Sequence, residues 1–164
     1  MSKRVKLLVA FCQILLFTSV LIAPFIEHYS TPYDPLSWQF QDSTSLLILG
    51  IVLSSLGALI IGIATHFGLN PRSPFNIFPF EYKPEYLVTT GLYCYIRHPQ
   101  ALGWLIGATG YLIVMNASWS LLLWPICLLF FLIEIPIEEH HLEHTYPEYA
   151  AYKDRTKRLI PYVW

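Results

Sequence analysis

Apolar residues gather into four long runs along the chain, separated by polar segments. The runs cover residues 7–26, 46–65, 101–115 and 119–133, and none contains a charged residue. About 20 apolar residues let a helix cross the hydrocarbon core of a bilayer. The first two runs have this length, and the last two are shorter. The pattern therefore predicts an all-α integral membrane protein with four transmembrane helices.

The connection between the third and fourth runs is only three residues long, Asn116 to Ser118. A loop this short joins two helices as an antiparallel hairpin. The start of the third helix and the end of the fourth should therefore lie on the same side of the membrane. Pro125 predicts a kink in the fourth helix. The polar segment that follows predicts two short helices, broken near Pro147.

We expect one membrane domain in this chain of 164 residues. Residues 1–65 would form two N-terminal membrane helices, and residues 66–164 would form a second module that carries any binding site. Composition agrees with a membrane protein, because 13% of the residues are charged, against roughly one quarter in a typical soluble domain.

The basic residues indicate how the helices are oriented. They fall into three groups, which are Lys3, Arg4 and Lys6; Arg72, Lys83 and Arg97; and Lys153, Arg155, Lys157 and Arg158. Four transmembrane helices place all three groups on one side, which the positive-inside rule identifies as the cytoplasm. Both termini and the site are therefore expected at the cytoplasmic face of a membrane, such as a prokaryotic inner membrane. Contacts with membrane lipids are expected, and a nucleic-acid partner is not.

The sequence Arg97-His98-Pro99 stands directly before the third run. Proline suits the first turn of a helix, and the residue before a proline avoids the helical conformation. Pro99 should therefore begin a helix whose first N–H groups, those of Gln100 and Ala101, are unpaired and can bind an anion. A simpler interpretation of Arg97 is a side chain that extends to the membrane surface.

Three glutamates stand at the end of the fourth run: Glu134, Glu138 and Glu139. Carboxylates beside a membrane span are costly unless they face the protein interior or a polar cavity. Glu134 and Glu138 are four residues apart and share a helix face. The hairpin would bring these glutamates to Arg97 and His98 in one cytoplasmic pocket. Such a pocket suits a zwitterionic ligand.

The segment "YLVTTGLYCYIRHPQALGW", the glutamate pair at 138–139 and the closing "LIP" together resemble the isoprenylcysteine carboxyl methyltransferase family and the related phospholipid methyltransferases. The resemblance covers about residues 75–164. It implies S-adenosyl-L-methionine as cofactor and a lipid-like or other apolar small molecule as acceptor. The cofactor contacts that it implies are Glu85, Tyr86, Leu87, Val88, Tyr93, His98, Pro99, Gln100, Ala101 and Glu138.

The charged residues nearest the expected reacting atoms are Arg97, Glu134 and Glu139, which are the candidate catalytic residues. In the family that the chain resembles, an arginine assigned to the substrate carboxylate stands where this chain has Glu134. A glutamate would repel an anionic acceptor. We therefore expect an acceptor that is neutral or cationic at the reacting atom. If that group is a protonated amine, Glu134 or Glu139 would take its proton.

Two other classes of protein remain open at this stage. Membrane reductases of the sterol-reductase type carry a similar Arg-His-Pro region and bind NADPH, but they are much longer than this chain. A non-catalytic membrane subunit could keep the same fold. The cluster His140, His141 and His144 could suggest a metal, but such membrane sites need several histidine clusters, so no metal is expected.

Overall fold

The computed structural model describes residues 3–30, 43–68, 87–117 and 120–160. Within these ranges the regular elements are helices, and one isolated bridge pairs Ile96 with Lys157. In chain order the helices are α1 (Lys3–Ser30), α2 (Thr44–Gly68), η1 (Gly91–Cys94), α3 (Pro99–Val114), η2 (Ser120–Leu122), α4 (Leu123–Thr145) and α5 (Tyr149–Arg155). The all-α fold class is confirmed.

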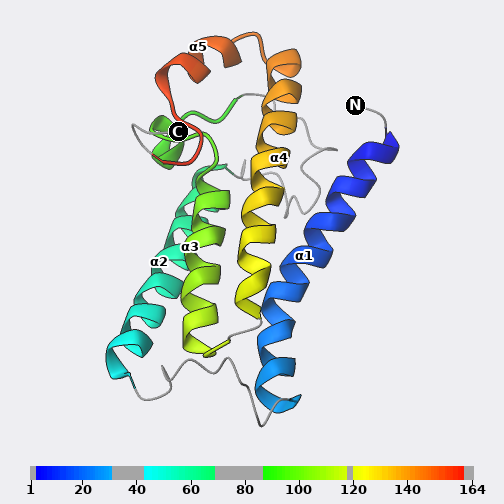
Figure 1. The fold of residues 1–164 in the computed structure, drawn as a ribbon. Helices are drawn as coiled ribbons and strands as arrows, with labels where there is room; N and C mark the ends of the chain where they lie inside the picture. The colour runs from blue at the N-terminus through cyan, green and yellow to red at the C-terminus, as the bar shows by residue number, and fades with distance from the viewer. Residues whose placement is uncertain (1–2, 31–42, 69–86, 118–119, 161–164) are drawn as a thin grey trace.

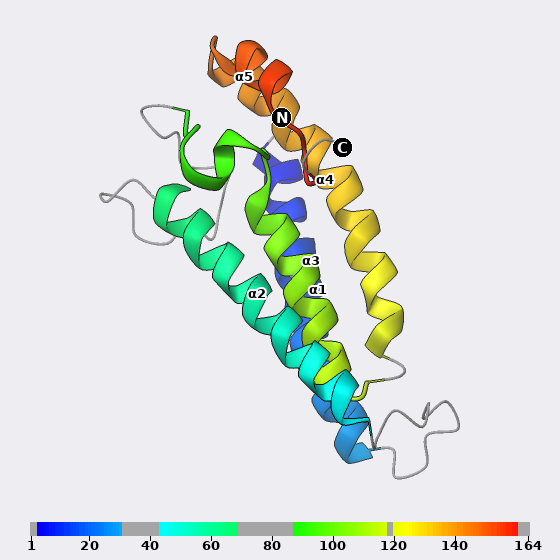
Figure 2. The same ribbon diagram turned by 90° about the vertical axis from the view of Figure 1, so that its left-hand side faces the viewer.

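The four long helices run alternately up and down, and α5 lies across one end of them (Figure 1). The N-terminal end of α1, the start of α3 and the C-terminal end of α4 all lie at that end. Seen from the side, α2 runs along α3 over most of its length (Figure 2). This arrangement places the Arg-His-Pro segment beside the glutamates of α4.

Among the described residues, two helices are long and apolar enough to cross a membrane, at Thr44–His66 and Ser120–Thr145. The apolar part of α1 is shorter, at Phe11–Glu27. Helix α3 has 16 residues, which corresponds to about 24 Å at the α-helical rise. The structure therefore supports a membrane protein with two full-length candidate spans, fewer than the four that the sequence predicts.

Large apolar side chains on the outer faces of these helices are exposed. Leu59 of α2 is 59% exposed, and Leu129 of α4 is 57% exposed. Similar residues line α1, where Phe11 is 63% exposed. Extended apolar surface of this kind is rare on soluble monomers. Contact with lipid tails accounts for it.

Helices α2 and α3 meet backbone to backbone through small residues. A Cβ atom added to Gly57 would overlap the backbone of Gly107, and one added to Gly110 would overlap that of Ser54. Small residues at such a crossing allow membrane helices to approach closely. This contact fixes the position of α3 relative to α2.

Aromatic stacking holds α1 against the hairpin of α3 and α4. The ring of Phe17 stacks on Trp104 with centroids 4.0 Å apart, and it lies 5.9 Å from the ring of Phe131. At the far end from the site, Glu27 accepts hydrogen bonds from the backbone N–H and the hydroxyl of Ser120, at 2.8 and 2.7 Å. These contacts join α1 to the start of the α4 segment.

Helix α4 differs from its predicted form. It runs without interruption through residues 138–144, where the sequence predicts a separate short helix. Pro125 lies in the first turn of α4, where the missing N–H costs nothing, so it does not interrupt the helix. The predicted break near Pro147 is confirmed, because α5 begins at Tyr149. The glutamates consequently share one continuous helix.

Candidate active site between α3 and α4

The candidate site begins where the chain enters α3. His98 is the N-cap of the helix, and Pro99 occupies its first position, as predicted. The carbonyl of His98 accepts the first hydrogen bond of the helix, from the N–H of Leu102 at 3.2 Å. The N–H groups of Gln100 and Ala101 precede that first bond and point out of the helix end.

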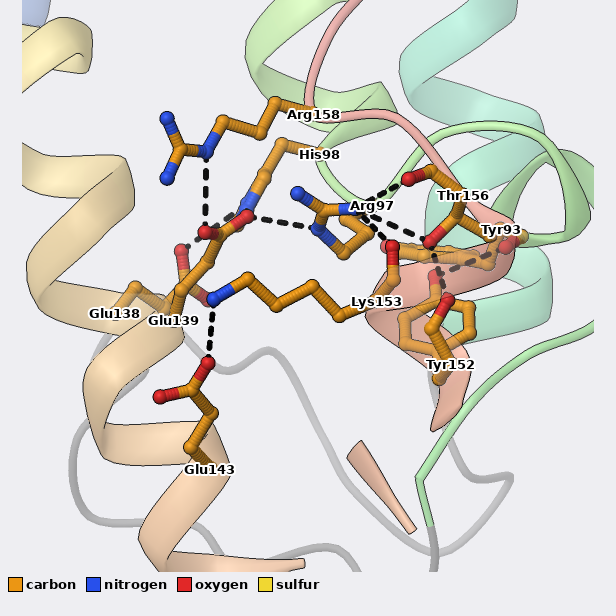
Figure 3. Close-up of polar contacts among 10 residues, drawn as sticks. All are labelled: Tyr93, Arg97, His98, Glu138, Glu139, Glu143, Tyr152, Lys153, Thr156 and Arg158. Atoms are coloured by element: carbon orange, nitrogen blue, oxygen red, sulfur yellow. Dashed lines mark hydrogen bonds and ion pairs between the residues drawn. The ribbon is translucent and has the colours of Figure 1, made fainter. Parts of the chain in front are cut away.

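His98 lies between two glutamates of α4 (Figure 3). Its Nδ1 is 3.4 Å from Oε2 of Glu138, and its Nε2 is 3.4 Å from Oε1 of Glu139. The second distance fits an ion pair, although Nε2 makes no hydrogen bond of good geometry. The imidazole is 7% exposed. The predicted meeting of His98 with the glutamate pair is therefore present.

The charge state of His98 follows from this position. Burial alone would lower the pKa of the imidazole, but the neighbouring carboxylates of Glu138 and Glu139 outweigh it and raise the pKa to about 9. His98 is therefore an imidazolium at neutral pH. Both glutamates act as its counter-ions.

The side chain of Arg97 is buried and donates hydrogen bonds to four acceptor atoms of the protein. Its Nε donates to Oε1 of Glu139 at 2.7 Å. Its Nη1 donates to the carbonyls of Lys153 and Thr156, at 3.1 and 2.5 Å, and to the hydroxyl of Thr156 at 3.3 Å. These contacts direct the guanidinium toward the C-terminal tail and Glu139, so its observed role is to join parts of the protein.

Glu139 is the centre of the charge cluster. Its side chain is 3% exposed, and one oxygen accepts from Arg97 while the other accepts from Arg158 at 3.1 Å. His98 lies beside the first oxygen. A buried carboxylate is costly unless it is paired, and this one has three cationic neighbours. Glu139 was a candidate catalytic residue, and here it anchors these three groups.

Glu134 differs from Glu139 in its surroundings. It lies one helical turn before Glu138 and is 7% exposed. Within the part of the chain that the structure describes, no hydrogen bond or ion pair reaches its carboxylate. A buried carboxylate without a partner is unfavourable in the isolated protein.

Tyrosines of the C-terminal tail pack against Leu87, which belongs to the predicted cofactor strip, residues 85–88. Tyr146, Tyr149 and Tyr152 form a buried cluster with Leu87 and Leu142. The cluster faces the protein interior. Val88 belongs to the same strip and is half-buried.

Tyr93 links the same strip to the glutamates. Its carbonyl accepts a hydrogen bond from the hydroxyl of Tyr152 at 2.9 Å. Burial and the charge of Glu138 raise the pKa of Tyr93 to about 12, so the phenol stays neutral. Gln100 is exposed, and its amide contacts the hydroxyl of Thr65 at 3.4 Å. Ala101 packs on the apolar core beside α4.

Glu85 and Tyr86, two of the predicted cofactor contacts, lie outside the described residues. His140 and His144 stack edge to face, with centroids 4.4 Å apart. Within the described ranges no group of three metal-ligating side chains comes together.

Sequence reasoning missed two residues of the cluster, Thr156 and Arg158. Both belong to the C-terminal tail, whose basic residues served only to orient the helices in the sequence-based prediction. Neighbouring Lys153 pairs with Glu143 at 2.6 Å on a more exposed surface. The available signal was the closing "LIP" of the resemblance, which places this tail inside the shared module.

Helices with apolar outer faces and a buried charge cluster at one helix start define an integral membrane protein with a polar site at one end. The chain matches the phospholipid methyltransferase family over residues 43–149 and belongs to that family. It is a membrane methyltransferase of the isoprenylcysteine and phospholipid type.

Two curated relatives support the same class. They are the probable protein-S-isoprenylcysteine O-methyltransferases of Oryza sativa subsp. indica and subsp. japonica. Each is 26% identical to this chain over 171 residues, and the match covers 99% of this chain and 78% of the relative. No solved structure matches the chain.

Proposed function

We propose that the chain is an S-adenosyl-L-methionine-dependent methyltransferase that acts on a lipid-like or other apolar acceptor. The observation that carries the proposal is that the N-terminus of α3 and the imidazolium of His98 lie beside two glutamates in different surroundings. Glu138 is partly exposed and Glu134 is buried. His98 supplies the cation, and Glu138 and Glu134 supply the anions. A family assignment alone would not specify this arrangement.

The residues present fit the cofactor's charges. Its carboxylate suits the N–H groups at the start of α3, assisted by His98. Its ammonium group suits Glu138, whose side chain is 37% exposed and therefore accessible. Leu87, Val88 and Tyr93 would contact the apolar parts. Within the described residues, the candidate cofactor contacts lie in four places: residues 87–88 before η1, Tyr93 in η1, residues 98–101 at the start of α3, and Glu138 in α4.

The bound cofactor supplies an electrophilic methyl group on a sulfonium. The protein's contribution is to hold the acceptor in line with that group and to exclude water. Glu134 would accept a proton if the acceptor is a protonated amine. Arg97 and Glu139, which bind one another, would keep the site in shape rather than contact the reacting atoms.

The acceptor is proposed to be neutral or cationic at its reacting atom. Glu134 lies about 6 Å along the helix from Glu138, since four residues rise 1.5 Å each. It is buried and unpaired among the described residues, and its charge would act on the bound acceptor whenever the carboxylate is ionised. The apolar outer faces of the helices support an acceptor that arrives from the membrane.

We also propose four transmembrane helices with the site on the cytoplasmic side. The start of α1 and the tail lie at the same end of the bundle (Figure 1), as an even number of crossings requires. All basic residues fall at this end by the predicted topology.

This orientation can be tested by cysteine labelling, in a variant whose three native cysteines are replaced by serine. Ser43→Cys should react with an impermeant maleimide added to intact bacterial cells that express the protein. Lys157→Cys should react only after the cells are permeabilised. Equal labelling of both positions in intact cells would contradict the four-helix topology.

Cofactor binding can be tested by calorimetric titration of the detergent-purified protein. The wild type should bind S-adenosyl-L-methionine, and Glu138→Gln and His98→Ala should each weaken binding by about 1–3 kcal/mol, because each removes a partner of a charged group. Glu143→Gln is the matched control, since Glu143 lies on the same helix and pairs only with exposed Lys153 among the contacts described above.

Two outcomes would reject the proposal. Binding of NADPH in place of S-adenosyl-L-methionine would favour a reductase. Binding of neither molecule by folded protein would favour a non-catalytic subunit.

A further inference from the structure

The C-terminal tail pairs with the segment that leads into α3. The backbone N–H of Arg97 donates to the carbonyl of Lys157 at 2.7 Å, and that of His98 donates to the carbonyl of Arg158 at 3.0 Å. The N–H of Lys157 donates back to Tyr95 at 3.2 Å. The tail is thereby held in register with His98, although 60 positions separate the two in the sequence.

Arg158 contacts the site through both its backbone and its side chain. Its carbonyl holds the backbone of His98, and its Nε holds Oε2 of Glu139 at 3.1 Å. The other oxygen of Glu139 lies 2.7 Å from Arg97 and 3.4 Å from His98 (Figure 3). The side chain of Arg158 is 29% exposed, against 3% for Glu139. It therefore closes the charge cluster on its outer side.

We propose that Arg158 is a positioning residue of the cofactor site. By holding one oxygen of Glu139, it leaves the other oxygen in a fixed place for Arg97 and His98. The carbonyl of Arg158 also holds the backbone of His98. Arg158 therefore positions both members of the ion pair between His98 and Glu139. The inference rests on the proposed function, and it adds a residue of the C-terminal tail to the proposed cofactor site.

The electrostatic consequence has a definite sign. His98 faces Glu138 and Glu139, with Glu134 one turn further along α4, and the cations Arg97 and Arg158 lie across Glu139. Removal of the Arg158 charge takes away a repulsive neighbour of the imidazolium. His98 should then keep its proton to a higher pH, even though Glu139 is less well placed.

The test compares Arg158→Met with Arg158→Lys and with Lys153→Met, which removes a cation from the same tail. In calorimetry at pH 7.5, Arg158→Met should bind S-adenosyl-L-methionine about three- to fivefold more weakly than the wild type, as expected for a partly exposed ion pair. Arg158→Lys should recover part of this loss, and Lys153→Met should bind like the wild type.

A second measurement does not need the cofactor. The imidazole of His98 can be titrated by NMR in the cofactor-free protein, with its signal assigned by its absence in His98→Ala. The midpoint should move upward in Arg158→Met and stay in place in Lys153→Met. The alkaline loss of cofactor binding should move in the same direction, because the imidazolium form is the one that binds.

Three results would overturn the proposal. They are wild-type affinity in Arg158→Met, an equal loss in Lys153→Met, and a loss of affinity with an unmoved His98 midpoint, which would mean a purely structural role. Failure of the wild type to bind the cofactor would refute the proposed function instead. The NMR midpoint would still show whether Arg158 acts on His98.

Discussion

Replacing Glu139 with glutamine should destabilise the folded protein by about 3–5 kcal/mol, the usual cost of removing one partner from a buried ion pair. The guanidinium of Arg97, which is 7% exposed, would keep its charge and lose its carboxylate. His98 and Arg158 would lose the same counter-ion. Glutamine fills nearly the same volume, so the loss would report charge rather than packing.

The measurement is equilibrium unfolding in detergent, with Glu143→Gln as the control. That glutamate lies one turn further along α4, and its pairing with Lys153 is exposed, so its loss should change stability by at most about 1 kcal/mol. Equal destabilisation by the two variants would contradict the central role of Glu139. A stable Glu139→Gln protein would mean that water can solvate Arg97.

Replacing Glu134 should change which acceptors are methylated. At an effective dielectric constant near 20, a unit charge a few ångströms from the reacting atom contributes roughly 4 kcal/mol. The wild type should therefore methylate a lipid amine in preference to a prenylcysteine carboxylate. Glu134→Arg should reverse this preference, and Glu134→Gln, which is closer in size, should abolish it.

The measurement is transfer of radiolabelled methyl groups to the two acceptors with matched lipid tails. Cofactor affinity, measured in parallel, separates a loss of acceptor preference from a damaged site. If the wild type methylates the carboxylate well and neither variant changes the preference, Glu134 has a structural role. A preference that changes in Glu134→Arg but not in Glu134→Gln would point to the arginine that is introduced instead of the loss of the glutamate charge.

The parts of the site that the sequence predicts are those encoded locally. Pro99 and the residue before it determine where α3 begins, because a proline restricts both positions. The short loop after α3 requires a hairpin, and the hairpin brings His98 to Glu138 and Glu139. Each step depends on a few neighbouring residues.

The parts that the sequence does not predict depend on contacts between distant segments. The pairing of Lys157 with Ile96 uses backbone groups, which carry no residue-specific signal. The basic side chain of Arg158 fits a lipid headgroup as well as it fits Glu139. The role of Glu139 also changes in the structure, because spacing alone does not show that three cations share one carboxylate.

The contact of the Phe17 ring with Trp104 and Phe131 has a consequence for biosynthesis. Helix α1 is synthesised first, but the rings that hold it belong to α3 and α4, about 90 and 110 positions further along the chain. Helix α1 cannot complete its packing until nearly the whole protein has left the ribosome. Helices α2 and α3 can pack sooner, because the contacting residues Gly57 and Gly107 are 50 positions apart.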